Sequence, residues 1–293
     1  MFQSDLYCSF DKDGKSLGCG DFGRPQEFSG LIEGALGDFD SNGALDFLLA
    51  HTWGVTLIMG GGSVPVAVDY KPGDGLDVGD VDGDGAPEIL IWDGKEVNMF
   101  RFNPLSGSEL ILSFRGPPLP AGRLAVGDVL GNQRAEIVLL DDMRIRIFNE
   151  TEIEGSFCLP REGLAVAVGN LVRGIECLRV VLVVDAAMFT WYDFAGHVLD
   201  QFPAAFGERD HLAVGNLDGI GSDEIVQVHY TPSANGTLPA GTLAVLDAHG
   251  GRERSFPGAQ MHLPSAMYWG RLRARSFRSL KVGCTFWTRM ATC

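Results

Sequence analysis

Residues 76–92 read LDVGDVDGDGAPEILIW, a stretch that combines a recurring block with an acidic loop. The block, LDVGDV at its start, returns as LAVGDV at 124–129 and LAVGNL at 212–217, and more loosely as GALGDF at 34–39 and VAVGNL at 166–171. The Asp or Asn after the glycine lies at positions 38, 80, 128, 170 and 216, so the copies are 42 to 48 residues apart. A period of this length indicates an array of similar supersecondary units.

Each copy continues with the same order of segments. A polar loop leads to an apolar run, as in Glu88–Ile91 and Glu136–Leu139, and then to an alternating run such as Arg144–Phe148. Short apolar runs predict strands buried on both faces, and alternation predicts a half-exposed strand. Because no segment shows a helical period with caps at both ends, we expect an all-β protein. A unit of about 45 residues with four short strands is the size of one blade of a β-propeller.

The repeats also predict how the chain is divided. A lone blade cannot cover both of its faces, so we expect the units to stack into a single propeller over residues 1–293. The expected blades are 30–74, 75–120, 121–163, 164–210 and 211–258. Near the N-terminus LYCSFD, residues 6–11, resembles LAVLD, residues 243–247, a late strand of the fifth unit. We therefore expect residues 1–29 and 259–293 to complete a sixth blade together, with seven blades as the alternative.

Composition and charge exclude several classes of protein. Of the 293 residues, 45% are hydrophobic and 39 are glycine, which excludes a disordered chain and agrees with many tight turns. Residues 1–258 carry 17 basic and 38 acidic side chains and should repel nucleic acid, whereas residues 259–293 carry six basic and no acidic ones. No apolar stretch approaches the roughly 18 residues of a membrane span. No signal peptide is visible either, so an intracellular protein and a mature or truncated chain both stay open.

The acidic loop of the second unit has the ligand types of a calcium site. Its positions 1, 3, 5 and 9 are the carboxylates of Asp80, Asp82, Asp84 and Glu88. Gly85 at position 6 permits a sharp bend, and the carbonyl of Ala86 can join the carboxylates. Ca²⁺ takes six to eight oxygen ligands, so a loop rich in protein oxygens suits it better than Mg²⁺. The first unit repeats the pattern with Asp38, Asp40, Asn42, the Ala44 carbonyl and Asp46, which makes about two expected Ca²⁺ sites.

Acidic loops of this kind have two other common interpretations, an EF-hand and a simple turn. An EF-hand requires a bidentate Glu at position 12, where the first two loops have Leu49 and Ile91, and strand-like runs flank both loops. Asp and Asn also form turns without any metal. In the third loop, which has Leu130 at position 3, the metal and turn interpretations stay equal; its candidate ligands are Asp128, Asn132 and Glu136. In the fourth and fifth loops the turn interpretation is favoured.

With the repeats and the acidic loops together, residues 30–258 resemble the FG-GAP/VCBS repeat family, the calcium-loop propeller repeats also found in integrin α-subunits. This resemblance implies Ca²⁺ bound between the first and second strands of some blades. It also implies an extracellular or cell-surface protein that binds a protein or carbohydrate ligand in adhesion. The expected role of Ca²⁺ is to stabilise the fold, because clustered acidic side chains would otherwise repel one another.

The face opposite to the acidic loops is the expected ligand face. Aromatic residues are frequent binding anchors, although each one could simply pack within its own blade. The aromatic candidates on this face are Trp53, Tyr70, Trp92, Phe206 and Tyr230. We expect a non-enzymatic, adhesion or lectin-like binding module, because the six histidines form no cluster and no nucleophile motif is present. The alternatives are a polysaccharide lyase-like enzyme acting on acidic glycans and a fragment of a larger receptor ectodomain.

Overall fold

The computed structural model describes residues 6–10, 16–21, 31–42, 46–51, 54–59, 62–66, 75–93, 96–103, 107–115, 123–141, 143–149, 152–171, 180–203, 205–207, 210–215, 222–231 and 240–257. Throughout these residues the regular secondary structure is β-strand, as predicted. This part of the chain accordingly contains no helix that could cross a bilayer. Residues 259–293, which are expected to complete a sixth blade together with residues 1–29, lie outside the described residues.

The strands form five four-stranded antiparallel sheets and one two-stranded sheet in this part of the chain. The two-stranded sheet consists of β1 (Leu6–Phe10) and β2 (Ser16–Asp21). The next two sheets are β3 (Leu31–Gly37), β4 (Asp46–His51), β5 (Gly54–Met59), β6 (Gly62–Val66), and β7 (Gly75–Gly79), β8 (Glu88–Trp92), β9 (Glu96–Asn103), β10 (Gly107–Arg115). The last three are β11 (Arg123–Gly127), β12 (Glu136–Asp141), β13 (Arg144–Phe148), β14 (Ile153–Cys158), then β15 (Ala165–Gly169), β16 (Val180–Val184), β17 (Met188–Tyr192), β18 (Val198–Pro203), and β19 (His211–Gly215), β20 (Glu224–Thr231), β21 (Ala240–Leu246), β22 (Arg252–Pro257).

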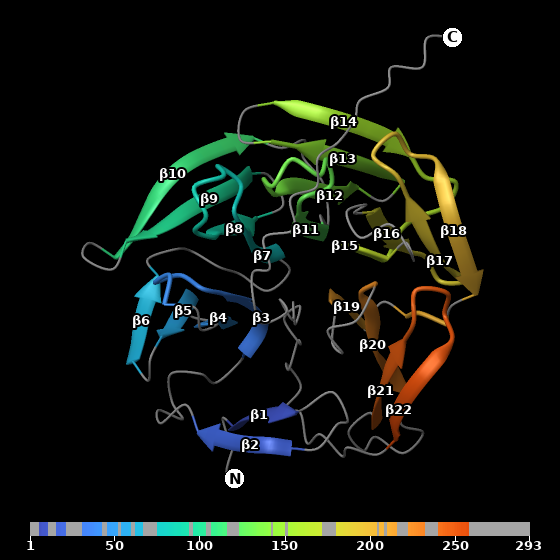
Figure 1. Cartoon of the computed structure of the whole chain (residues 1–293), viewed down its shortest axis with the longest axis horizontal. Helices are drawn as coiled ribbons and strands as arrows, with labels where there is room; N and C mark the ends of the chain where they lie inside the picture. The colour runs from blue at the N-terminus through green and yellow to red at the C-terminus, as the bar shows by residue number, and fades with distance from the viewer. Residues whose placement is uncertain are drawn as a thin grey trace.

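The sheets are arranged around a centre in a propeller-like manner (Figure 1). In each four-stranded sheet the strands follow chain order from the inside outward, so β3, β7, β11, β15 and β19 lie innermost. Each of these inner strands packs beside the inner strand of the next sheet, from β3 through β19. The β1–β2 pair lies between the sheet β3–β6 and the sheet β19–β22 (Figure 1). Each four-stranded sheet falls within one of the five repeat units.

The hydrophobic core lies between consecutive sheets rather than within one. Four buried clusters each combine side chains from two neighbouring sheets. The second strands carry much of this core, and every residue of β8 is buried. A strand with neighbours on both faces needs apolar side chains on both faces, which explains the continuous apolar runs. Full burial of one such side chain contributes about 1.5–3 kcal/mol, so a sheet depends on its neighbours for stability.

The glycine of the recurring block is required by the packing of adjacent sheets. A Cβ atom at Gly79 would lie 2.5 Å from Val126 Cγ1, and one at Gly169 would lie 2.3 Å from Val214 Cγ1. Both valines belong to the inner strand of the next sheet. Beside Gly79, Asp77 adds a polar link, because its Oδ2 accepts a hydrogen bond from Val126 N at 2.7 Å. At these two positions the block therefore brings the inner strands of adjacent sheets close together.

Candidate metal-binding loops and a ligand cavity

Three acidic loops join the first and second strands of their sheets and share one scaffold of hydrogen bonds. Loop I (38–46) joins β3 to β4, loop II (80–88) joins β7 to β8, and loop III (128–136) joins β11 to β12. In each loop the carboxylate at position 9 accepts a hydrogen bond from the backbone N–H at position 2. The pairs are Asp46 Oδ2 with Phe39 N at 3.0 Å, Glu88 Oε2 with Val81 N at 2.8 Å, and Glu136 Oε2 with Val129 N at 2.6 Å.

Loop I brings its predicted carboxylates together. One oxygen from each of Asp38, Asp40 and Asp46 lies within 4.8 Å of the others. Asn42 N donates to Asp38 Oδ1 at 3.0 Å and to Asp40 Oδ1 at 3.2 Å, and Asn42 Nδ2 donates to Asp40 Oδ2 at 2.9 Å. These bonds hold the carboxylates of one loop in a small volume. Ala44, whose carbonyl was a predicted ligand, lies outside the described residues.

Loop II forms a similar cluster. Oxygens of Asp80, Asp82 and Glu88 lie within 4.8 Å of one another. The two oxygens of Asp80 accept from Gly83 N at 2.7 Å and Gly85 N at 2.9 Å. Gly83 and Gly85 have φ values of 80° and 91°, so the sharp bend predicted for the loop uses a left-handed backbone that favours glycine. The participation of the Ala86 carbonyl stays a prediction.

Arg101 on β9 reaches into loop II and was missed by the sequence interpretation. Its Nη2 contacts Asp82 Oδ2 and lies 3.2 Å from Asp84 Oδ2, and its Nε lies 3.7 Å from Glu88 Oε1. A guanidinium among three carboxylates offsets part of their charge. Within an alternating strand, a basic residue is an ordinary exposed residue, so no sequence signal pointed to Arg101.

The position-9 carboxylates are electrostatically unusual because they are buried. Burial raises the pKa of Glu88 to about 7; the hydrogen bond from Val81 opposes this rise, and the charges of Asp84 and Asp80 add to it. Burial likewise raises the pKa of Asp46 and that of Glu136. A divalent cation beside such a group would favour the charged form.

The donor set of loop II fits a hard cation such as Ca²⁺. All of its candidate side-chain ligands are oxygens, which Ca²⁺ prefers. Glu88 Oε1 is buried and forms no hydrogen bond with the described residues. A buried carboxylate oxygen without a hydrogen bond is costly, and metal coordination would satisfy it. If Ca²⁺ is bound, the residues present to hold it are Asp80, Asp82, Asp84 and Glu88.

Loop III keeps the scaffold with fewer ligands. Asp128 accepts from Asn132 N at 2.9 Å and from Gln133 N at 3.1 Å, as an acidic turn does without metal. Leu130 occupies position 3 and is exposed, so two carboxylates remain, those of Asp128 and Glu136. This geometry favours the turn interpretation for loop III. The loops of the fourth and fifth units fall mostly within 172–179 and 216–221, outside the described residues.

The aromatic candidates for the ligand face need correction where they are described. Trp92 is fully buried, between the sheets β7–β10 and β11–β14, and Phe206 belongs to the core between the last two sheets. These two side chains pack the core and are not accessible to a ligand. Trp53 and Tyr70 lie outside the described residues, and Tyr230 is placed on β20 without a described side chain. The sequence does not indicate whether an aromatic side chain near a strand end faces the core or solvent.

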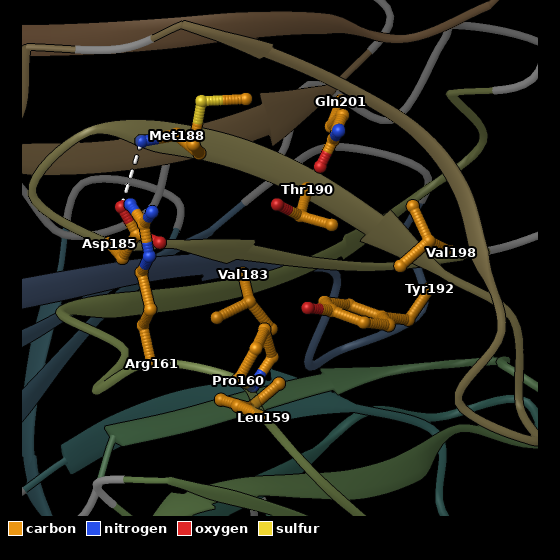
Figure 2. Close-up of a pocket in the computed structure, with 10 residues that line it drawn as sticks. All are labelled: Leu159, Pro160, Arg161, Val183, Asp185, Met188, Thr190, Tyr192, Val198 and Gln201. Carbon is orange, nitrogen blue, oxygen red and sulfur yellow. Dashed lines mark hydrogen bonds between the residues drawn. The ribbon is translucent and has the colours of Figure 1, made fainter.

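A cavity of about 330 Å³ lies between the strands β16–β18 and the segment 159–161 that follows β14 (Figure 2). Arg161 belongs to the segment that joins β14 to β15, and Asp185 and Met188 flank the turn between β16 and β17, so this end of the cavity is opposite to the acidic loops. Thr190, Tyr192 and Gln201 continue the wall along β17 and β18, as Figure 2 shows. The remaining lining residues are Leu159, Pro160, Val183 and Val198. The cavity therefore combines hydrogen-bonding groups, one cation, one carboxylate and apolar surface.

An Asp–His pair links the segment before β19 to β20, at the same end of the sheets as Arg161 and Asp185. His229 Nδ1 lies 2.7 Å from Asp210 Oδ2, and the Asp210 side chain is buried while His229 is half-exposed. Gly207 N also donates to Asp210 Oδ2, at 3.0 Å, and Gln227 Nε2 donates to Ala205 O at 2.7 Å. A buried carboxylate that orients a half-exposed imidazole can support proton transfer. The sequence offered no signal because the two residues are 19 positions apart.

Comparison with known proteins establishes a likeness of fold alone. No family model and no curated protein matches the sequence. A protein of unknown function from Bacteroides caccae has a TM-score of 0.54 at 11% identity, over 87% of this chain and 90% of that chain. The Tc holotoxin pore of Photorhabdus luminescens has a TM-score of 0.47 at 14% identity over 84% of this chain, which spans 13% of that chain's length. The Pan2 WD40 domain of Neurospora crassa has a TM-score of 0.46 at 12% identity, over 79% of this chain and 66% of that chain.

Proposed function

We propose that this chain is a six-bladed propeller of the FG-GAP/VCBS type, stabilised by Ca²⁺, that acts as a non-enzymatic binding module for a protein or carbohydrate ligand. The observation that carries the proposal is the convergence of carboxylate oxygens in loops I and II on a shared scaffold of backbone hydrogen bonds. In this proposal β1 and β2 belong to the sixth blade, and residues 259–293, which are expected to complete it, lie outside the described residues. An adhesion role at the cell surface follows from the resemblance to the family.

Ca²⁺ acts on stability in this proposal. The loops gather acidic groups whose mutual repulsion opposes folding, and the position-9 carboxylates are buried as well. An ion that binds only the folded state stabilises it by mass action, by about 2.7 kcal/mol when its free concentration is 100 times Kd. The acidic loops on one face would therefore stabilise the fold when they bind Ca²⁺, and the opposite face is the proposed ligand-binding face.

The test of Ca²⁺ is the melting temperature of the full chain. We expect chelator to lower the melting temperature by about 5 °C and excess CaCl₂ to restore it, with MgCl₂ much less effective. Asp40→Ala should remove most of this response, because Asp40 is one of the three clustered carboxylates of loop I. An unchanged melting temperature in chelator would contradict the role of Ca²⁺.

The cavity beside Arg161 supports a polar ligand such as a carbohydrate. Hydroxyl, amide and guanidinium groups line it beside apolar side chains, a combination typical of ligand sites. On a glycan array, Arg161→Ala and Gln201→Ala should each weaken binding about tenfold or more, a loss of about 1.4 kcal/mol. Arg144→Ala, which removes an exposed arginine outside the cavity, is the matched control. Equal binding by all three variants would place the ligand elsewhere.

A second candidate, a lyase for acidic polysaccharides, is favoured by the Asp210–His229 pair alone. A lyase needs a base, and His229 held by the buried Asp210 could accept a proton. Incubation with acidic polysaccharides should then give unsaturated products with ultraviolet absorbance, and His229→Ala should abolish them. His197→Ala is the control, since His197 forms a similar pair with Asp193 at 2.9 Å in the turn between β17 and β18. If the wild-type protein gives no product, the lyase function is contradicted and the binding module is the proposal that stands.

A further inference from the structure

We propose that Arg101 is an internal counter-cation of loop II that competes with Ca²⁺, so that loop I fills first and loop II binds Ca²⁺ only when Arg101 withdraws. This inference rests on the proposed Ca²⁺ sites and assigns them different affinities. It also makes Arg101, a residue of the third strand, a determinant of metal binding in a loop between the first and second strands.

The contacts of Arg101 place its charge among the candidate ligands. Nη2 contacts Asp82 and lies 3.2 Å from Asp84, and Nε lies 3.7 Å from Glu88 Oε1. All three carboxylates are candidate ligands of the same ion. Two cations within a few ångströms repel strongly, so Ca²⁺ and the guanidinium cannot share these oxygens. Entry of Ca²⁺ therefore requires the side chain to leave.

Arg101 offsets part of the charge of loop II but forms no hydrogen bond with Glu88 Oε1. Glu88 Oε1 and Arg101 Nε are both buried and neither forms a hydrogen bond with any described residue, although they face each other at 3.7 Å. A Ca²⁺ ion would coordinate Glu88 Oε1 directly, whereas the guanidinium forms no hydrogen bond with this oxygen. The Arg101 side chain is 40% exposed, so it can move into solvent without opening the core. Glu88 Oε1 thus still favours Ca²⁺ binding in loop II, while the Arg101 guanidinium competes with the ion for the same carboxylates.

Loop I provides the natural comparison because its sheet has the same strand register. Phe47 pairs with Ile58 just as Ile89 pairs with Phe100, so Met59 occupies the position equivalent to Arg101. Met59 packs against the apolar cluster between the first two four-stranded sheets and carries no charge. An ion entering loop I therefore meets no arginine from this position. Exchanging Met59 and Arg101 should exchange the behaviour of the two loops.

The experiment is a calorimetric titration of CaCl₂ into the metal-free full chain and its variants. We expect one tight site in wild type and two in Arg101→Met, with loop II tightening about 10- to 100-fold, equivalent to about 1.4–2.8 kcal/mol. Met59→Arg should weaken the tight site by a similar factor. Arg146→Met is the matched control for net charge, because Arg146 pairs with Asp141 at 3.1 Å in another sheet and should leave both sites unchanged.

Combined variants assign each site to its loop. Asp40→Ala should remove the tight site of wild type, whereas Asp40→Ala with Arg101→Met should keep one tight site in loop II. Circular dichroism and the melting temperature establish that each variant is folded. Two equally tight sites in wild type, or an Arg101→Met variant that titrates like wild type, would overturn the role of Arg101.

The titration also separates this inference from the proposed function. If wild type binds no Ca²⁺ but Arg101→Met gains a site, the general Ca²⁺ proposal fails and the role of Arg101 stands. If no variant binds Ca²⁺, both are refuted.

Discussion

Loops I and II have almost the same side chains but different electrostatic surroundings. Both place a carboxylate cluster at the end of a sheet and both bury the position-9 carboxylate. Loop II also receives the Arg101 guanidinium from the third strand of its sheet, where loop I has Met59 at the equivalent position. The charge balance of a loop is therefore set by a residue that is distant in sequence, and matching motifs do not guarantee matching affinity.

Loop III extends the comparison by separating the scaffold from the charge. It keeps the bond from Val129 N to Glu136 and the bonds to Asp128, although an exposed leucine replaces one carboxylate. The position-1 and position-9 acidic residues are thus needed to shape the loop whether or not a metal binds. The carboxylates at positions 3 and 5 distinguish loop II from a simple turn.

The largest expected difference between loops I and II is in the cost of losing the position-9 carboxylate. Glu88→Ala should lower the free energy of unfolding by about 3 kcal/mol, because it leaves the buried Val81 N–H unpaired and removes a partner of Arg101. Asp46→Ala should cost about 1–2 kcal/mol, since it removes the acceptor of Phe39 N and since Met59, not an arginine, occupies the position equivalent to Arg101.

Urea denaturation in chelator measures both losses. Glu162→Ala, at an exposed position in the segment before β15, is the control and should stay within about 0.5 kcal/mol of wild type. A larger loss for Asp46→Ala than for Glu88→Ala would contradict the part assigned to Arg101.

The second largest expected effect is a dependence of stability on pH, which arises from the buried position-9 carboxylates. The raised pKa of Glu88, about 7 in the fold against 4.5 ordinarily, means that the folded state binds a proton more tightly than the unfolded chain. Stability without Ca²⁺ is therefore highest below the ordinary pKa and is lost as pH rises from there through about 7, by about 3 kcal/mol for Glu88. The raised pKa values of Asp46 and Glu136 act in the same direction.

The melting temperature in chelator, measured between pH 5 and pH 8, tests this loss of stability. Glu88→Gln should flatten most of the slope, and excess CaCl₂ should weaken it because Ca²⁺ binds the charged carboxylates. A stability in chelator that rises with pH over this range would show that the buried carboxylates do not titrate as described.

The smallest expected difference lies in the glycines that precede the two loops. A Cβ at Gly79 would lie 2.5 Å from Val126 Cγ1, whereas at Gly37 the nearest atoms, on Phe39 and Pro87, are 3.1 Å away. Gly79→Ala should therefore cost about 1–2 kcal/mol through overpacking, and Gly37→Ala less than about 1 kcal/mol. Urea denaturation of the two variants with wild type measures this. Equal costs would mean that the two sheets are equally free to move apart.

Much of the fold could be predicted because its signals are local. The apolar runs and the repeat predicted an all-β protein of short antiparallel strands, which is confirmed, and the carboxylates of loops I and II do converge. The interpretation of Trp92 and Phe206 was wrong, because the sequence does not tell which side of a strand end faces a neighbouring sheet. Arg101, the cavity beside Arg161 and the Asp210–His229 pair were not predicted at all.

The sequence alone determined the periodicity, the strands and the acidic loops, since each depends on residues within one turn or one strand of each other. Only the tertiary structure decided which charges meet those loops and which surfaces stay open. Arg101 reaches loop II because adjacent strands place residues 13 or more positions apart side by side, and the cavity exists because the segment 159–161 folds against β16–β18. Electrostatic and packing energies depend on distance in space, which the order of residues does not specify.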